Sequence, residues 1–89
     1  MRVEVGSASW TDLETLLDTT FEEGASYDVQ LVEGRQVMIV QGASEPTDSK
    51  DGFILEYNQG CTITKESGKN FYVKSFNQGC KLYVAEGGE

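Results

Sequence analysis

The 89-residue sequence has no histidine, one proline and two cysteines. Without histidine it lacks the usual base at neutral pH, the usual partner in a catalytic triad and the imidazole ligand for metals. We therefore expect no enzymatic activity, no cofactor and no metal. Two cysteines are too few for a disulfide scaffold. The N-terminus also lacks the basic-then-apolar layout of a signal peptide, so we expect the chain to be made in a reducing cytoplasm.

Basic residues are also scarce. Seven Lys and Arg stand against fifteen Asp and Glu, which gives a formal net charge of -8. Binding to the phosphates of nucleic acid or to anionic lipid needs clustered Lys and Arg, so we expect neither partner. The sequence contains no 18-residue apolar run, and we expect no transmembrane span.

The acidic residues do not supply a catalytic or metal site either. Glu22 and Glu23 fall in an expected turn, and Asp48 and Asp51 in a polar segment, where no apolar surroundings would raise the pKa of one carboxyl. In that segment Lys50 occupies a position where a calcium loop needs an oxygen ligand, and no Glu stands at the twelfth position.

A short echo marks the C-terminal half of the chain. Tyr57-Asn58-Gln59-Gly60-Cys61 and Phe76-Asn77-Gln78-Gly79-Cys80 share the order aromatic-Asn-Gln-Gly-Cys, nineteen positions apart. Asn and Gly favour turns, and each copy lies between two alternating apolar runs. The pattern predicts a β-meander over residues 52–86. We interpret the echo as shared turn chemistry rather than as a duplication.

The N-terminal part predicts one strand and one helix. Residues 2–5 alternate in polarity and end at a glycine, which indicates a short strand. Ser9 can cap a helix over about residues 10–18. One apolar stripe of this helix would consist of Trp10, Leu13, Leu16 and Leu17. This helix should lie across the sheet and bury Trp10.

The middle of the chain predicts a hairpin over residues 27–41 around Glu33-Gly34. In that register Val29 would face Met38 and Leu31 would face Gln36. The polar segment 42–51 predicts an exposed loop, and residues 87–89 a frayed end.

These elements predict one mainly β domain over residues 1–89. The expected architecture is a small β-sandwich or a partly open barrel of about seven or eight strands with one short N-terminal helix. A chain of this length builds a modest core, for which oligomerisation or docking is a common remedy.

The meander fixes an expectation for the two cysteines. Cys61 and Cys80 would begin strands at the same end of the sheet, with the strand 70–76 between them. Two strand spacings are about 9–10 Å, whereas a disulfide needs Cα atoms within about 7 Å. We therefore expect free thiols that behave as small apolar groups.

One face of the meander would carry aromatic and basic side chains together. The other face of the meander would hold the apolar side chains of Phe71, Val73, Leu82 and Val84. The aromatic and basic face would hold the side chains of Ile54, Tyr72, Lys74, Phe76, Lys81 and Tyr83. This face either packs beneath a second layer or forms a contact surface, and the sequence leaves both interpretations open. On the second interpretation the partner-binding residues are Trp10, Tyr72, Lys74, Phe76, Lys81 and Tyr83.

The charges are unevenly distributed along the chain. Four of the seven basic residues fall in 65–81, while residues 1–30 hold seven acids against Arg2 alone. This asymmetry could favour contacts between copies of the chain, and we expect a homo-oligomer.

The spacing of the landmarks carries a resemblance. In order they are Val3-x-Val5, Ala8-x-Trp10-x-x-Leu13, Gly24-x-x-Tyr27-x-x-Gln30, Val37-x-Ile39, Ala43-x-x-Pro46-Thr47, Tyr72-Val73-Lys74-Ser75 and Leu82-x-Val84. This layout resembles short bacteriophage virion proteins, a loose group of head-decoration, head-fibre and tail-adaptor modules. The resemblance implies a small, often oligomeric β-domain with a structural role in the virion, synthesised in the host cytoplasm, with other virion proteins as partners.

Two other functions stay open. The first is a small acidic inhibitor that binds a host protein, which would require dense acids on one exposed face. The second is a glycan-binding module, suggested by the aromatic residues and the Asn-Gln turns.

Overall fold

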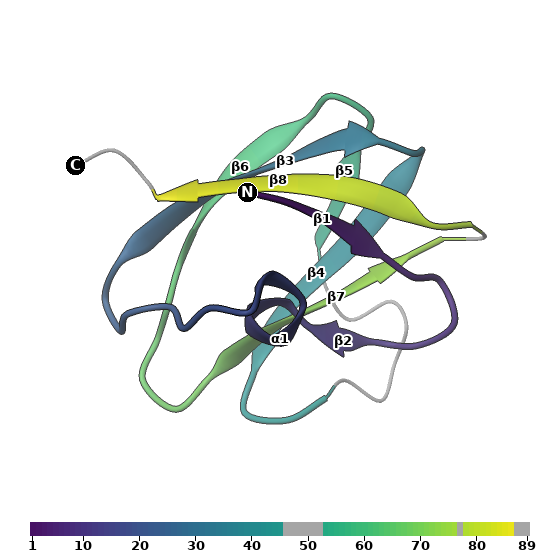
Figure 1. Cartoon of the computed structure of the whole chain (residues 1–89). Coiled ribbons are helices and arrows are strands. Elements are labelled where there is room, and N and C mark those ends of the chain that lie inside the picture. The colour runs from purple at the N-terminus through teal and green to yellow at the C-terminus, as the bar shows by residue number, and fades with distance from the viewer. Residues whose placement is uncertain (46–52, 77, 87–89) are drawn as a thin grey trace.

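The chain forms two four-stranded antiparallel sheets and one short helix (Figure 1). The structure is a computed structural model, and it describes residues 1–45, 53–76 and 78–86. Sheet A has the order β1-β8-β3-β6 and sheet B the order β2-β7-β4-β5. The elements are β1 Arg2–Val5, β2 Thr11–Asp12, α1 Leu13–Leu17, β3 Ser26–Glu33, β4 Gln36–Gly42, β5 Phe53–Glu56, β6 Gly60–Thr64, β7 Asn70–Ser75 and β8 Cys80–Glu86. The prediction of a small, mainly β sandwich with one short helix is confirmed.

The expected hairpin over 27–41 is wrong. Strand β3 pairs with β6 and β8 in sheet A, whereas β4 pairs with β5 and β7 in sheet B. The turn at Gly34-Arg35 therefore carries the chain from one sheet to the other. In a hairpin, Val37 and Ile39 would have faced away from Val29, but the crossing brings all three side chains into one core.

The expected meander over 52–86 is wrong for the same reason. Strands β5 and β7 belong to sheet B, and β6 and β8 belong to sheet A. Val73 pairs with Ile39, and Val84 pairs with Val29, so the expected Val73–Val84 pairing does not form. Among the described strands, β4 and β5 alone are both consecutive and paired. Both Asn-Gln-Gly segments lie at crossings from sheet B to sheet A, which gives the echo a common structural role.

The core lies between the two sheets. Strand alternation turns one side of each strand inward, and the inner faces meet in one cluster. Phe21 stacks on Tyr27 with ring centroids 4.1 Å apart, and Phe71 lies 6.3 Å from the same phenylalanine. The buried members of the cluster are Val5, Leu13, Phe21, Tyr27, Val29, Leu31, Val37, Ile39, Leu55, Ile63, Phe71, Val73, Cys80, Leu82 and Val84.

The helix is shorter than predicted. Helix α1 spans Leu13–Leu17, and its cap is Asp12, whose side chain accepts a hydrogen bond of 2.9 Å from the Glu14 backbone N–H. Strand β2 takes up the residues before it, because Thr11 pairs with Val73 of sheet B. The expected Ser9 cap and the start at Trp10 are therefore wrong, and Leu13 rather than Trp10 is the fully buried residue.

Part of the expected loop 42–51 is described. Strand β4 ends at Gly42, and residues 43–45 are exposed. The rest of that loop, the segment 48–52 weighed as a calcium loop and the expected frayed end 87–89 lie outside the described residues.

Candidate functional site

The residues predicted to bind a partner do not share one face. Tyr72, Lys74, Lys81 and Tyr83 lie on strands and point away from the core, as expected, but on two different sheets. Trp10 lies just before β2 rather than on a helix. Tyr72 and Lys74 lie on the outer face of sheet B, while Lys81 and Tyr83 lie on the outer face of sheet A. The single face expected from a meander is therefore wrong, because each turn between these strands crosses the sandwich.

The outer face of sheet B has an apolar middle with polar residues around it, since Asp12 lies beside Tyr72 and Gln36 lies beside Glu56. Met38 lies between Ile54 on one neighbouring strand and Lys74 on the other. Val40 lies beside Tyr72 in the same way. Ile54 is 46% exposed, Val40, Tyr72 and Lys74 are half-buried, and Met38 is buried. We call these five residues, with half-buried Trp10 just before β2, the sheet B face.

The outer face of sheet A is mostly polar. Thr62 donates a hydrogen bond of 2.8 Å to Asp28, and the hydroxyls of Ser26 and Thr64 are 3.0 Å apart. Tyr83, 43% exposed, is the large apolar exception on this face. The outer face of sheet A is thus more polar than the middle of the outer face of sheet B.

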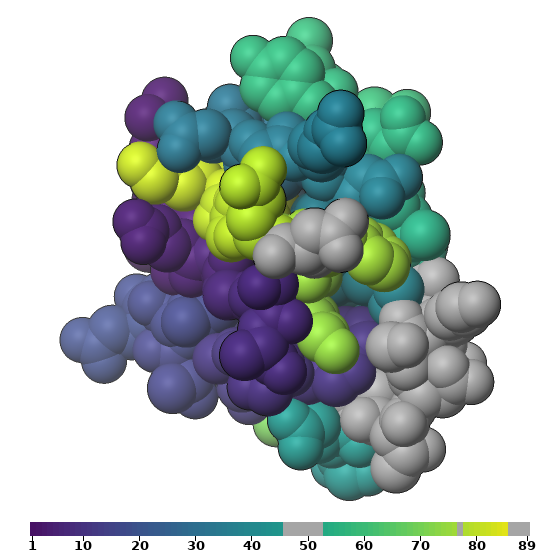
Figure 2. Space-filling model, turned by 90° about the vertical axis from the view of Figure 1, so that its right-hand side faces the viewer, coloured from purple at the N-terminus to yellow at the C-terminus, as the bar shows by residue number. Residues whose placement is uncertain are grey.

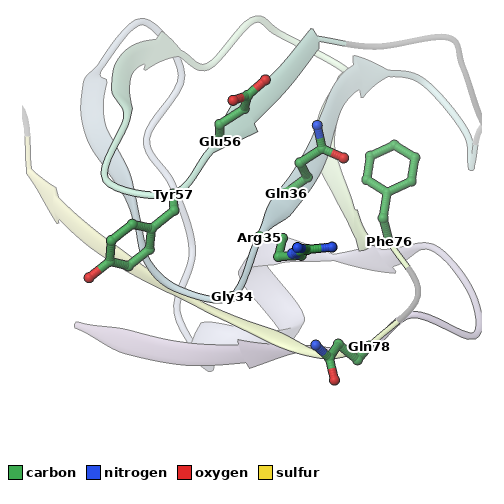
Figure 3. A pocket seen from close by; sticks show the side chains of 7 residues that line it. All are labelled: Gly34, Arg35, Gln36, Glu56, Tyr57, Phe76 and Gln78. Atoms are coloured by element: carbon green, nitrogen blue, oxygen red, sulfur yellow. The ribbon is translucent and has the colours of Figure 1, made fainter.

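A groove opens at the end of the sandwich where three turns between the sheets meet (Figure 3). Figure 2 views the molecule from the right-hand side of Figure 1, where the turn between β3 and β4 lies. The volume of the groove is about 610 Å³. The turns are β3–β4, β5–β6 and β7–β8. The residues that line the groove are Gly34, Arg35, Gln36, Glu56, Tyr57, Phe76 and Gln78.

Backbone hydrogen bonds join the turns around the groove. The Tyr57 N–H donates to the Arg35 carbonyl oxygen at 3.1 Å, which ties the β5–β6 turn to the β3–β4 turn. The Gln36 carbonyl oxygen accepts from the Ser75 hydroxyl at 3.4 Å and from the Phe76 N–H at 3.5 Å. The Ser75 hydroxyl also donates to the Gln78 carbonyl oxygen. The groove walls are therefore positioned by backbone groups and by the buried Ser75 hydroxyl rather than by the exposed side chains.

Gly34 fixes the β3–β4 turn against β8. Its φ is 107°, in the region that favours glycine. A Cβ at this position would lie 2.5 Å from the Cβ of Cys80. A side chain would push the turn away from β8 and shift Arg35.

Sequence reasoning identified one of the groove residues, Phe76. It missed Arg35, Gln36, Glu56, Tyr57 and Gln78. A signal for Tyr57 was present, because Tyr57 opens the first copy of the echo as Phe76 opens the second, and both residues line the groove. The missing information was that both copies cross between sheets at the same end of the sandwich.

The ion pairs change the expected charge asymmetry. Lys65 contacts Glu14 at 2.6 Å, Lys69 contacts Glu66 at 3.1 Å, and Lys81 contacts Glu33 at 3.6 Å. Three of the four basic residues in 65–81 are therefore paired within the chain. Lys74, on the sheet B face, is the fourth, and it forms no ion pair with any residue that the structure describes.

Both cysteines are free. They lie on β6 and β8 with β3 between them, not with the strand 70–76 between them as expected. Cys61 pairs with Val29 in the middle of β3, whereas Cys80 lies beside Gly34, the residue after the end of β3. Burial raises the pKa of both thiols, and for Cys61 the nearby Asp28 carboxylate raises the pKa further.

The described part of the chain holds no group of three or more Cys, Asp or Glu side chains placed to share a metal ion. Nor does it contain a helix long and apolar enough to span a membrane. Comparison of the chain with protein-family models, with curated proteins and with solved structures gives no match. Function therefore has to be inferred from the surfaces themselves.

Proposed function

We propose that the protein is a non-enzymatic structural component of a bacteriophage particle, on the head or the tail, that docks on another virion protein through the sheet B face. The resemblance of the landmark spacing to that of short virion proteins supports a location in the phage particle. The different character of the two outer sheet faces supports docking through the sheet B face. No catalytic step is part of this proposal.

The contrast between the two outer faces carries the proposal. The face of sheet A is polar, and its hydroxyls and carboxylates bond to one another across the strands. The sheet B face instead presents exposed Ile54 and half-buried Val40 beside two half-buried aromatic side chains, Trp10 and Tyr72, whereas its central Met38 is buried. Contiguous apolar surface of this kind marks interaction sites, and aromatic residues dominate the energetics of such contacts.

Lys74 gives the docking surface one electrostatic feature. Its side chain is half-buried beside Met38, and its ammonium group has no acidic partner among the described residues. The stem can pack against apolar surface while the charged end reaches the rim of a contact. We propose that the partner presents a carboxylate at that rim.

Self-association is a further part of the proposal. Two copies could meet through the same face around a two-fold axis, so that each buries the apolar surface of the other. The charge argument for head-to-tail contacts is weaker than the sequence implies, because Lys65, Lys69 and Lys81 are paired internally.

The test compares two matched substitutions on opposite faces. Ile54 and Tyr83 are 46% and 43% exposed, so Ile54→Glu and Tyr83→Glu place the same charge at similar exposure. We expect Ile54→Glu to lower the number of copies of the chain per purified phage particle, because a carboxylate in an apolar contact is strongly unfavourable. Tyr83→Glu should leave that number unchanged. Equal incorporation of both variants would contradict docking through the sheet B face.

A further inference from the structure

We propose that the groove between the three turns binds a neutral saccharide, with Tyr57 and Phe76 contacting the sugar rings and Arg35, Gln36, Glu56 and Gln78 bonding to the hydroxyl groups. This site is separate in function from protein docking on the sheet B face. It is built from Tyr57 of the first echo copy, from Phe76 and Gln78 of the second, and from residues next to them on β4, β5 and the β3–β4 turn.

The two aromatic side chains provide the apolar part of the site. Tyr57 is 63% exposed, and Phe76 is half-buried. Figure 3 shows the rings on either side of Arg35. The C–H faces of a pyranose ring are apolar, and an aromatic ring with its polarised C–H and π surfaces packs well against them.

The polar side chains provide the specific contacts. Arg35, Gln36, Glu56 and Gln78 all end in planar groups with adjacent donors or acceptors, which suit two neighbouring hydroxyls. Within residues 1–45, 53–76 and 78–86, none of these four side-chain ends forms a hydrogen bond or ion pair. A ligand would therefore bind these four groups without breaking a hydrogen bond or an ion pair among the described residues.

The charges of the groove favour a neutral ligand. Its lining contains one guanidinium, on Arg35, and one carboxylate, on Glu56, which balance formally. The chain as a whole carries a net charge of -8. An anion such as a phosphate or a carboxylate would approach an acidic protein with a single cation to hold it, whereas a hydroxyl-rich neutral ligand meets no such repulsion.

The site is already formed in the unliganded chain. The backbone bonds from Tyr57 to Arg35 and from Phe76 to Gln36 hold the three turns together, and Gly34 holds the central turn against Cys80. The volume of about 610 Å³ lies in the range of small-molecule sites. Because the turns that line the groove are already held in place, binding a ligand orders little of the chain and carries a smaller entropic cost.

The test is an amide NMR titration of the full chain with millimolar maltose, cellobiose, lactose and N,N′-diacetylchitobiose, each added separately. We expect at least one sugar to shift the amides of Arg35, Gln36, Tyr57 and Phe76 in a saturable way. Tyr57→Ala should weaken that binding by roughly two- to tenfold. Tyr83→Ala removes an exposed aromatic ring from sheet A and should leave the affinity unchanged.

Several results would overturn the inference. They are the absence of shifts with all four sugars, shifts centred on Tyr83 rather than on the groove, or equal affinity of wild type and Tyr57→Ala. Shifts at Arg35 with inorganic phosphate but with none of the sugars would make the groove an anion site and would also overturn it. Incorporation into particles does not depend on any of these results, so the two proposals can fail separately.

Discussion

The backbone N–H of Tyr57 donates a hydrogen bond of 3.1 Å to the carbonyl oxygen of Arg35. Each residue lies in a turn that crosses between the sheets, and the bond joins the two turns directly. Both residues line the groove, and Figure 3 shows their side chains pointing in opposite directions from the joined turns. This relationship turns an exposed end of the sandwich into a site with defined geometry.

Substitution of Gly34 tests how tightly that end is fixed. In Gly34→Ala the new Cβ would lie 2.5 Å from the Cys80 Cβ at a φ of 107°. Backbone strain and overpacking together should lower the free energy of unfolding by about 2–4 kcal/mol. Chemical denaturation measures the change.

Gly68→Ala is the control for this effect. Gly68 also has a positive φ, of 76°, but nothing lies within 4 Å of a Cβ placed there. We expect a smaller loss of about 1–2 kcal/mol from strain alone. Equal losses for the two variants would show that the contact between Gly34 and Cys80 does not constrain the turn.

A buried ion pair holds the helix to the rest of the sandwich. The Lys65 ammonium lies 2.6 Å from Glu14 Oε2 and donates a hydrogen bond of 2.8 Å to Asn70, while Glu14 Oε1 accepts from the Phe21 N–H at 2.6 Å. The side chains of Lys65 and Glu14 are 9% and 13% exposed. Lys65→Met would leave the Glu14 carboxylate without its cation. It should cost about 3 kcal/mol and lower Tm by roughly 12–24 °C.

Lys69→Met is the matched control for the buried pair. Lys69 contacts Glu66 at 3.1 Å, but both side chains are exposed, so its loss should cost less than about 1 kcal/mol. Calorimetry on the two variants compares the effects. A similar change in Tm for both would mean that burial adds nothing to the Lys65–Glu14 pair.

Alternation along the strands could be predicted from the sequence. Strand β1 has the predicted bounds, and Phe71, Val73, Leu82 and Val84 are buried as predicted. Strand partners could not be predicted, because an inward-facing Val73 has the same sequence pattern whether its neighbour is Val84 or Ile39. The choice depends on whether a turn continues one sheet or crosses to the other, and that choice is decided by the packing of the whole core.

The same limit explains the candidate site. The aromatic residue of each echo copy stands out in the sequence, but Arg35 is 22 and 41 positions away from Tyr57 and Phe76 along the chain. Only the crossing of three turns at one end brings these residues together. The helix begins at Leu13 rather than at Trp10 because Thr11 pairs with Val73 in sheet B, which leaves Asp12 as the helix cap.

The cysteines should react slowly with thiol reagents. Burial raises the pKa of both thiols, so the reactive thiolate is less populated at neutral pH than in an unfolded chain. We expect half-buried Cys61 to react before buried Cys80, with rates that rise with pH. Reaction with a chromogenic disulfide, with Cys61→Ser and Cys80→Ser to assign the phases, measures this order. Faster labelling of Cys80 would contradict the burial found at β8.

These raised pKa values also set a pH dependence. The folded pKa of each thiol lies above its unfolded pKa, so the unfolded chain loses its thiol protons first. The contribution to stability is therefore present below the unfolded pKa and is lost as the pH rises through the folded pKa. Denaturation of wild type and of the Cys61→Ser, Cys80→Ser double variant should show a steeper alkaline loss in the wild type. Parallel curves would contradict the expectation.

Self-association should involve the sheet B face. Light scattering over a concentration series should give a mass above that of the 9.8 kDa chain, and Ile54→Glu should return it to the monomer. Tyr83→Glu, on the opposite face, should behave like wild type. A monomer at every concentration would remove self-association from the proposal while leaving docking on another virion protein open to test.

The most direct test of the proposed function is the number of copies of this chain in purified phage particles, determined by quantitative mass spectrometry. The proposal predicts a fixed ratio of this chain to a head or tail protein, retained after a high-salt wash, because burial of apolar surface depends little on ionic strength. Recovery of the chain only in the particle-free fraction of the lysate would contradict a structural role in the virion.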